Sequence, residues 1–422
     1  MGAQSFVEAT RAPRGDGVPV REARRRILEE LAPRPGYEYL PLSAALGRVL
    51  AENVEAPVDV PAHDNAAMDG YALRSFDLPA EGTAQLRLAG RVLAGESCET
   101  PLEAGACVRI MTGAPLPPGA DAVVMQEHAG VIDERWVQVS AGIKAGENVR
   151  YAGEDLAAGG VALSAGHRLR PQEIGVLGSL GRSEVAVHRR PVVVYFSTGD
   201  ELRSPGQPLG PGQRYDSNRH LLGAALRRLG VEAHDGGVIG DDAGEVTAAL
   251  CDAGAYADAV ISTGGVSVGD ADEVKQALTE AGDVVFWRVA MRPGHPLAYG
   301  QVCGAVFFGL PGNPVSAAAN FYQLVQPGLR KLMGEAGTLQ PLQLPVIAAE
   351  PLRKRPGRME FQRGIVEQDG EGRVQVYATG AQGSGMLTSL VRANCLIVLE
   401  QERGSVAAGE TVHIQPLEGV QL

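Results

Sequence analysis

Val192-Val-Val-Tyr-Phe-Ser-Thr-Gly-Asp-Glu201 joins a short apolar run to a Ser-Thr-Gly turn that carries two acids. The arrangement recurs at Ala259-Val-Ile-Ser-Thr-Gly-Gly265, and the apolar run at 305–308 leads into Gly309-Leu-Pro-Gly-Asn313. Apolar runs of this length are typical of strands buried on both faces of a sheet. Because helical patterns separate them, residues 189–334 predict right-handed βαβ crossovers and a mostly parallel sheet covered by helices.

The helical patterns lie between these runs. In residues 218–229, five apolar side chains share one helical face: Leu221, Leu222, Ala225, Leu226 and Leu229. Further helices are expected near 272–279 and from Val315 onward, with a strand at 284–287. These elements complete the expected α/β domain.

The flanking sequence predicts three further regions. Residues 57–159 consist of short apolar runs between turns, which indicates an inserted β-rich domain with strands at 86–88, 107–111, 122–125 and 136–139. Residues 21–56 and 160–188 form a small, partly helical linking region on both sides of that insertion, with helical patterns at 23–31 and 42–50. Residues 335–422 contain only strand-like runs and predict a C-terminal β-barrel-like domain, with strands at 344–348, 361–366, 374–377, 395–399 and 411–414. Residues 1–20 are expected to be loose.

Composition excludes several classes of partner. The chain has 422 residues, and 38 basic against 50 acidic residues give a net charge of -12, which disfavours nucleic acid and anionic lipid. No apolar stretch is long enough for a transmembrane helix, and the Arg-rich start has no apolar core typical of a secretory signal. The five cysteines are odd in number, far apart and without a CxxC pair, which favours a reducing cytoplasm and disfavours structural zinc.

Three loops after the predicted strands are candidates for ligand binding. In open parallel sheets, ligands bind at the carboxyl ends of the strands, where glycines and helix N-termini expose N–H groups to oxyanions. Each loop taken alone is also what an ordinary strand-to-helix turn requires. The recurrence of Ser-Thr-Gly at two strand ends favours a shared ligand site.

Acidic residues follow the same strand ends. Asp200 and Glu201 lie in the first loop, Asp270 and Asp272 in the second, and Asp241-Asp242 after a further apparent strand. Clustered carboxylates need a cation, and oxygen ligands without His or Cys suit Mg²⁺. Capping of helix N-termini is an equally good explanation for Asp242 and Asp272.

Two other stretches carry polar chemistry. Arg288, Arg292 and His295 place cationic groups around a Pro-Gly turn, and an Arg guanidinium matches phosphate or molybdate-like oxyanions. Pro61-Ala-His-Asp-Asn-Ala-Ala-Met-Asp-Gly-Tyr-Ala72 is too polar for a buried strand and has the composition of a functional loop. His63 within it has no evident partner.

Together these motifs resemble those of the MoeA family, the molybdopterin molybdenumtransferases, which includes the gephyrin E domain. The matching stretches run in the family's order from about residue 20 to the C-terminus: 64–72, 109–115, 124–127, 153–155, 196–201, 215–218, 264–272, 310–316 and 361–364. The resemblance implies the last step of molybdenum cofactor synthesis. In that step molybdate is inserted into adenylylated molybdopterin and AMP is released in the presence of Mg²⁺.

The resemblance also implies an elongated homodimer with a cleft shared between subunits, and transient contact with a molybdopterin-adenylylating protein. It assigns the reaction to six positions: Asp69, Thr112, Asp155, Glu201, Asp241 and Asp272. Of these, Glu201, Asp241 and Asp272 are the expected Mg²⁺ ligands. Substrate binding is expected from Ser197, Thr198, Gly199, Asp200, Asp216, Ser217, Asn218, Gly264, Gly265, Ser267, Arg288, Arg292, His295, Pro311, Gly312, Asn313, Ser316 and Arg363.

One departure and two alternatives accompany this expectation. The family often carries Lys where this chain has Arg288, Arg292 and His295, which changes reach and hydrogen-bond geometry. A second enzymatic hypothesis is adenylylation of molybdopterin by the α/β region, against which the loop of Asp69 argues. A third hypothesis is a dimeric, non-enzymatic scaffold that binds peptides, and retention of the acidic residues disfavours it.

Overall fold

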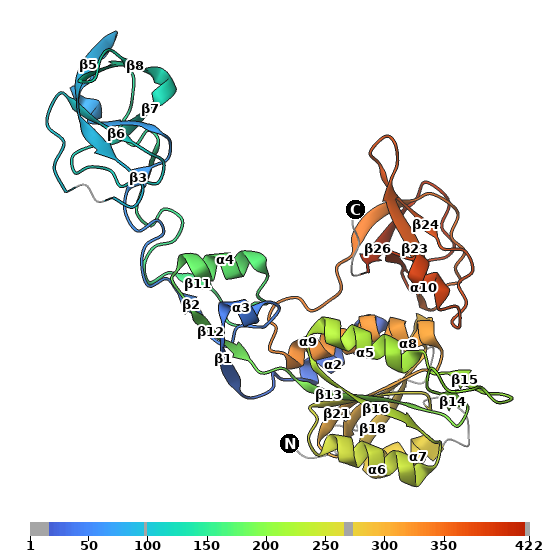
Figure 1. Ribbon diagram of the computed structural model, residues 1–422. Coiled ribbons are helices and arrows are strands. Elements are labelled where there is room, and N and C mark those ends of the chain that lie inside the picture. The colour runs from blue at the N-terminus through green and yellow to red at the C-terminus, as the bar shows by residue number, and fades with distance from the viewer. Residues whose placement is uncertain (1–16, 97–98, 266–272, 418–422) are drawn as a thin grey trace.

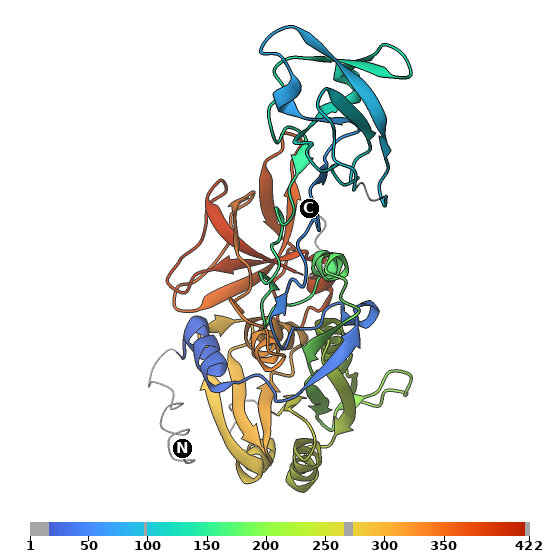
Figure 2. The ribbon, with the colours of Figure 1, turned by 90° about the vertical axis from the view of Figure 1, so that its left-hand side faces the viewer.

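The computed structural model describes residues 17–96, 99–265 and 273–417. The chain is extended, with a β-rich region at one end and an α/β region at the other (Figure 1). A view turned by 90° gives the same separation (Figure 2). The region between them joins the two, and the C-terminal strands form a further body beside the α/β region.

The α/β region has a sheet of six strands in the order β16-β13-β17-β21-β20-β18. Four are parallel, as predicted: β13 (Val192–Thr198), β16 (Glu232–Ile239), β17 (Ala259–Thr263) and β21 (Ala305–Leu310). The other two, β18 (Gly282–Arg288) and β20 (Pro296–Val302), pair antiparallel with each other, and β20 pairs antiparallel with β21. Because β20 runs antiparallel to both of its neighbours, β18 points in the same direction as β21, and the prediction of a mostly parallel sheet is confirmed. Strand β20 was not predicted from the sequence because Pro296 and Gly300 interrupt its apolar run.

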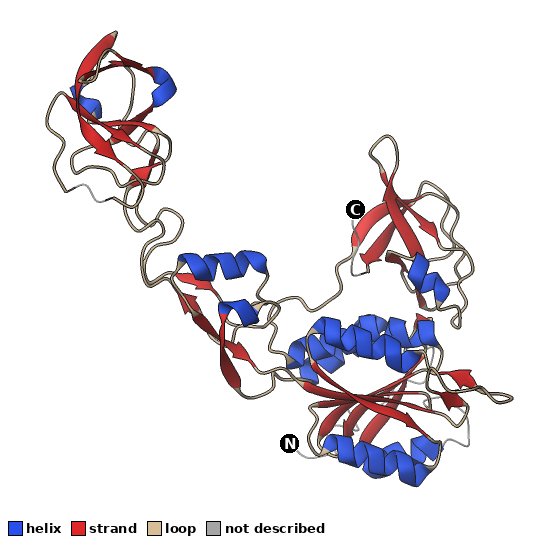
Figure 3. Ribbon diagram, viewed as in Figure 1, coloured by secondary structure: helices blue, strands red, loops and turns tan. Residues whose placement is uncertain are grey.

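Helices cover both faces of this sheet (Figures 1 and 3). On one face lie α2 (Val20–Glu30), α5 (Asn218–Leu229), α8 (Pro314–Asn320) and α9 (Gln326–Leu332), and on the other α6 (Ala243–Gly254) and α7 (Glu273–Ala281). The predicted helical face of α5 is confirmed, since Leu222, Leu226 and Leu229 are buried in one core cluster with the sheet. The long helix expected from Val315 contains a π-helical turn, η3 (Phe321–Val325).

The linking region is built from both of its sequence segments. Strand β1 (Tyr37–Pro41) pairs antiparallel with β12 (Glu184–His188), and β2 (Val54–Glu55) pairs with β11 (Val161–Leu163). Its helices are α3 (Leu42–Ala45) and α4 (Pro171–Ser179). The helix expected over 42–50 ends at Ala45 because Gly47 takes a φ of 75° and the chain then turns to bridge Val49 to Arg168.

The β-rich region consists mainly of strands (Figure 3). Its sheet has the order β7-β4-β6-β5-β9-β8. The strands of this region are β3 (Asn65–Ala66), β4 (Gly70–Leu73), β5 (Thr83–Val92), β6 (Ala106–Ile110), β7 (Ala122–Met125), β8 (Ala129–Val131), β9 (Trp136–Ser140) and β10 (Val149–Arg150). Two short 3₁₀ turns, η1 (Ser75–Asp77) and η2 (Gln126–His128), connect them.

The C-terminal strands close into a barrel, which confirms the predicted fold class. The five barrel strands are β22 (Leu344–Ala348), β23 (Met359–Gln368), β24 (Val374–Ala378), β25 (Cys395–Leu399) and β26 (Thr411–Pro416), and the pairing of β23 with β25 closes the ring. Two features differ from the sequence pattern. A short helix, α10 (Thr388–Arg392), interrupts the strands, and β19 (Met291–Arg292) extends this sheet from within the α/β region. The boundaries given above for the domains stay predictions.

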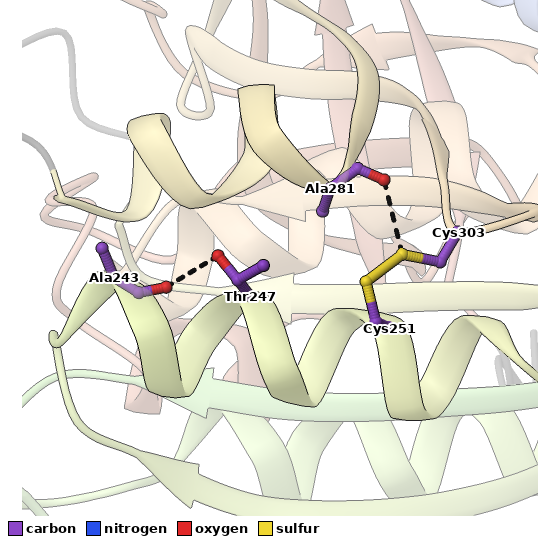
Figure 4. Close-up of a disulfide and its surroundings, with 5 residues drawn as sticks. All are labelled: Ala243, Thr247, Cys251, Ala281 and Cys303. Atoms are coloured by element: carbon purple, nitrogen blue, oxygen red, sulfur yellow. Dashed lines mark hydrogen bonds between the residues drawn. A yellow bond between two sulfur atoms is a disulfide. The ribbon is translucent and has the colours of Figure 1, made fainter.

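The cysteines differ from the sequence-based expectation of unpaired thiols. Cys251 on α6 is disulfide-bonded to Cys303 in the turn between β20 and β21, with the two Cα atoms 5.2 Å apart (Figure 4). The pairing was not visible in the sequence because 52 residues separate the two positions and only the fold brings them together. Cys107 and Cys395 are free and buried, and burial raises their pKa values to about 11 and 12.

Reducing this disulfide should lower the stability of the α/β region. A cross-link of this span restricts the unfolded chain and is worth about 2–4 kcal/mol. Urea unfolding with and without a reductant should show the loss, and Cys251→Ser should unfold at the same urea concentration in both conditions. Equal stability of the oxidised and reduced wild type would contradict the prediction.

Candidate active site

A cleft of about 900 Å³ lies at the carboxyl ends of the parallel strands. The turns that follow β13, β17 and β21 all line it, as the recurrent Ser-Thr-Gly pattern predicts. Two short parallel strands, β14 (Leu202–Arg203) and β15 (Arg214–Tyr215), form its outer wall. The position agrees with the rule that ligands of open α/β sheets bind outside the strand carboxyl ends.

Most predicted substrate-binding residues line this cleft: Ser197, Thr198, Gly199, Asp200, Asp216, Ser217, Asn218, Gly264, Gly265, Pro311, Gly312 and Asn313. Glu201 and Asp241 of the predicted reactive set line it too. Ser316 is buried inside α8 and is absent from the lining. Ser267 and Asp272 lie outside the described residues.

Several buried polar atoms at the cleft have no partner among the described residues. They are Ser197 Oγ, Thr198 Oγ1 and Asn218 Oδ1. A buried hydroxyl or amide that makes no hydrogen bond costs about 1–3 kcal/mol. Such atoms are retained where a ligand or ordered water completes them. These buried polar atoms therefore need hydrogen-bond partners, which points to a polar ligand in the cleft.

Asn218 holds the strand-end turns in place. Its Nδ2 donates to Thr263 Oγ1 at 2.7 Å and to the Gly312 carbonyl at 2.9 Å. Thr263 Oγ1 donates in turn to the Pro311 carbonyl at 3.2 Å. One buried amide thus joins α5 to the turns after β17 and β21, and leaves its own Oδ1 for a ligand.

Gly264 allows two of these turns to meet. Its φ is +99°, and a Cβ added there would overlap the Thr198 carbonyl oxygen. Gly264 N donates to the Leu310 carbonyl at 3.1 Å. The close approach of the turns after β13 and β17 therefore requires glycine on two independent grounds.

The acidic rim is only partly as predicted. Asp200 and Asp241 face each other, since the side chain of each accepts a hydrogen bond from the backbone N–H of the other at 3.3 Å. Glu201 is instead bound to Arg214, with Nη2 to Oε1 at 2.7 Å. Asp242 caps α6 through a bond from Glu245 N, so capping is its confirmed role. Within residues 17–96, 99–265 and 273–417, no three Asp, Glu, His or Cys side chains form a group that could hold a metal alone.

Sequence reasoning missed several members of the lining. Arg214 and Gly385 come from outside the three strand-end loops, and Pro296 opens the unrecognised strand β20. Gly385 belongs to the C-terminal region, and the neighbouring Ser384 carbonyl accepts a bond from Val315 N on α8. Contacts of this kind depend on tertiary structure, so local sequence patterns do not predict them.

A second cleft, of about 820 Å³, lies against the C-terminal barrel, and its lining has more cationic side chains than acidic ones, the latter being Glu350 and Glu360. Its cationic lining residues are Arg292, Arg353, Lys354, Arg355 and Arg363. Arg363 is 1% exposed, and its Nε and Nη2 donate to Ser389 Oγ and the Gly383 carbonyl. Burial lowers its pKa to about 10, so the guanidinium remains charged at neutral pH. The protein as a whole is negatively charged, so an oxyanion would bind more favourably in this cleft, where cationic side chains gather.

The predicted cations around the Pro-Gly turn do not join the first cleft. Arg292 lines the second cleft and lies 3.5 Å from Glu360, and Arg288 is exposed on β18. His295 Nδ1 donates to the Val289 carbonyl at 2.8 Å. Burial lowers the pKa of His295, the bond to the Val289 carbonyl opposes this, and Arg358 and Arg288 lower the pKa further, so the net shift favours the neutral ring. None of the three side chains is among the residues that line the α/β cleft, and their role in substrate binding stays a prediction.

The loop of Asp69 forms a separate polar surface on the β-rich region. Asp69 Oδ1 accepts bonds from Thr112 N at 2.8 Å and Thr112 Oγ1 at 2.7 Å. These two bonds lower the pKa of Asp69, and the charge of Arg109 adds to the effect, so the carboxylate is ionised at neutral pH. Asp155 lies on an exposed loop tied to this surface, because Ala152 N donates to Asp64 Oδ1.

Comparisons with known proteins agree with this geometry. Three family descriptions match in order: the MoeA N-terminal region (domain I and II) at 18–181, a probable molybdopterin binding domain at 195–331, and the MoeA C-terminal region (domain IV) at 345–417. A molybdopterin molybdenumtransferase of Haemophilus influenzae is 44% identical over 94% of this chain and 97% of its own length.

The chain belongs to the MoeA family. The resemblance stated from its motifs is thereby confirmed. A MoeA protein of Pyrococcus horikoshii OT3 has the same fold, with a TM-score of 0.81 and 29% identity over 95% of this chain and 100% of that one. Gephyrin of Dictyostelium discoideum is 33% identical over 93% of this chain, which spans 61% of that protein.

Within this MoeA protein, the predicted reactive residues fall into two groups. Glu201 and Asp241 lie at the α/β cleft, whereas Asp69, Thr112 and Asp155 lie on the β-rich region. Strands β3 and β14, which flank these groups, are at opposite ends of the chain in Figure 1. One copy of the chain therefore does not bring the two groups together.

Proposed function

We propose that this enzyme inserts molybdenum from molybdate into adenylylated molybdopterin, with Mg²⁺-dependent cleavage of the adenylate and release of AMP. The observation that carries the proposal is the α/β cleft with its unpartnered buried polar atoms and acidic rim, in a chain of the MoeA family. Buried hydroxyl, amide and backbone groups match a pterin and its phosphate, which present many hydrogen-bonding atoms.

The acidic rim fits Mg²⁺ bound jointly with a phosphate. Mg²⁺ is often held by one or two carboxylates together with substrate phosphates. Asp200 and Asp241 supply two adjacent carboxylates, and no ion pair of either is found in the described part of the chain. When bound, the ion would reduce the negative charge of the phosphates. Glu201 would first have to leave Arg214, so Asp200 replaces it as the second candidate ligand beside Asp241.

Molybdate would bind in the basic cleft. Its tetrahedral dianion matches the guanidinium of Arg363, which is buried and has only neutral hydrogen-bond acceptors around it in the described residues. Arg292 at the mouth of the cleft would add a second positive charge. The segment 380–385 contributes to both clefts, since Gly380 and Gln382 line the basic one and Gly385 the α/β one.

The second half of the reaction site would come from a second copy of the chain. Several large apolar side chains of the linking region are exposed, as in a surface that another subunit covers: Tyr37, Tyr39, Leu46, Val161 and Val176. A homodimer built on this surface would bring the Asp69 loop of one subunit to the α/β cleft of the other. Such an assembly would explain why strands β3 and β14, which flank the two groups, lie at opposite ends of one chain in Figure 1.

The setting of the enzyme is part of the proposal. A cytoplasmic location and transient contact with a molybdopterin-adenylylating protein would match a substrate that is adenylylated beforehand. In the described part of the chain, no helix has the length and hydropathy needed to cross a membrane.

Incubation with adenylylated molybdopterin, Mg²⁺ and molybdate tests the proposed activity. We expect AMP and metal-loaded pterin to form together, and neither to form without Mg²⁺. AMP release without metal loading would show that the protein only hydrolyses the adenylate and does not insert molybdenum. Binding of peptides with no turnover would support the scaffold hypothesis instead.

Arg292→Ala should weaken molybdate binding without disturbing the fold. The side chain is 65% exposed and its one described ion pair, with Glu360, is long at 3.5 Å. Loss of one charge-assisted bond should cost about 1–3 kcal/mol of binding free energy. Calorimetric titration with molybdate measures this, with exposed Arg373→Ala on the barrel as control. Unchanged affinity would remove Arg292 from the molybdate site.

A further inference from the structure

A third, smaller cavity lies apart from both clefts. It has a volume of about 140 Å³ and lies between the first turn of α2 and the segment that leads into β22. Its lining residues are Val20, Arg21, Arg24, Gln340, Pro341, Gln343 and Met359. Liquid water occupies about 30 Å³ per molecule, so the cavity has room for one small tetrahedral ion.

Among the described residues, the buried cation Arg24 has no acidic partner. Its side chain is 5% exposed, and Nε and Nη2 donate to the carbonyl oxygen and Oε1 of Gln323 at 2.8 and 2.7 Å. In residues 17–96, 99–265 and 273–417, no carboxylate lies within ion-pair distance of it. Burial lowers its pKa to about 10, so the group is still protonated at neutral pH. An uncompensated buried charge is unfavourable and is normally paired with an ion of opposite sign.

The surroundings of Arg24 add further positive potential. Arg21, one turn away, lines the same cavity and makes no hydrogen bond or ion pair that the described residues reveal. Arg21 lies in the first turn of an 11-residue helix, where the helix dipole is positive, and Arg24 lies one turn later; Pro19 at the N-cap makes no side-chain capping bond to the free N–H groups. Glu22, the acid of this first turn, is bound to Arg25 and Arg26. It therefore does not neutralise the cavity.

The cavity wall also offers neutral donors. Gln340 and Gln343 have side-chain amides for which no hydrogen bond is found in the described part of the chain. Amide N–H₂ groups and guanidinium groups together match the oxygens of a tetrahedral dianion.

We propose that this cavity binds a small divalent oxyanion of phosphate size through Arg21 and Arg24, independently of the proposed reaction. The ion would bind where α2, the π-helical turn and the C-terminal barrel meet. Gln323, which holds Arg24, donates through Nε2 to Gln415 Oε1 on the barrel strand β26 at 2.5 Å. A bound anion would thus fix α2, the π-helical turn and the barrel relative to one another.

Selenate, a tetrahedral dianion with an anomalous scatterer, tests the proposal in crystals of the full chain. We expect an anomalous peak within hydrogen-bonding distance of the Arg24 guanidinium. Arg21→Gln should remove the peak, because Arg21 is exposed and can be replaced without disturbing the core. Arg25→Gln removes the same charge from the same helix outside the cavity and should leave the peak unchanged.

The same variants can be compared in solution. Sodium selenate should raise the melting temperature of the wild type above that in sodium chloride of equal ionic strength, which controls for screening. Arg21→Gln should require at least tenfold more selenate for the same shift. No peak in the cavity, or a peak and shift equally strong in Arg21→Gln, would overturn the proposal.

Discussion

Asp69→Asn should nearly abolish AMP release from adenylylated molybdopterin while leaving the fold intact. Asn retains an Oδ1 that can accept the bonds from Thr112 N and Oγ1, so the loop keeps its geometry. It loses the negative charge, which these bonds stabilise in Asp69. Loss of a catalytic acid or base typically lowers turnover by a factor of about 10²–10⁴.

Single-turnover release of AMP measures this loss most directly. The matched control is Asp133→Asn, an exposed acid in the hairpin between β8 and β9 whose Oδ1 likewise accepts backbone N–H bonds. Circular dichroism and sedimentation should be the same for both variants and the wild type. Full turnover by Asp69→Asn would show that this carboxylate takes no part in the reaction.

Gly264→Val should remove ligand binding at the α/β cleft and destabilise the region. A β-branched residue is strained at a φ of +99°, and its Cβ would overlap the Thr198 carbonyl and hydroxyl oxygens. Strain and overpacking of this kind cost about 2–5 kcal/mol together. Urea unfolding measures the stability, and calorimetric titration with adenylylated molybdopterin should show no binding to the folded variant.

Gly237→Val separates the two causes of this effect. Gly237 has a φ of +81° in the same region, but a Cβ added there would have no atom within 4 Å. That variant should bear the backbone strain alone and keep the cleft. Equal losses of affinity in the two variants would show that the contact of Gly264 with Thr198 does not shape the site.

Much of the α/β region could be predicted because its signals are local. The helix at 218–229 and the run at 192–196 bury their apolar residues through contacts whose periodicity the sequence displays. The strand β20 could not be predicted in this way, because its proline and glycine are tolerated only through pairing with β18 and β21. The disulfide between Cys251 and Cys303 likewise exists only through the packing of α6 on the sheet.

In the candidate site too, local sequence predicted some features, whereas others depend on tertiary contacts. Glycine-rich turns after buried strands predicted the cleft, since the carboxyl ends of parallel strands must meet at one edge. The partner of Glu201 could not be predicted, because Arg214 reaches it from a separate short strand. The neutral state of His295 depends on burial and on Arg358, which is distant in sequence.

The proposed shared site can be tested by mixing two inactive variants. Asp69→Asn impairs the β-rich half of the site, and Asp241→Asn impairs the rim of the α/β cleft. If each site combines halves from two subunits, a mixed dimer contains one site with both changes and one with neither. After subunit exchange at equal amounts, half of the dimers are mixed, so about a quarter of wild-type AMP release should return. A mixture no more active than the two variants kept apart would contradict the shared site.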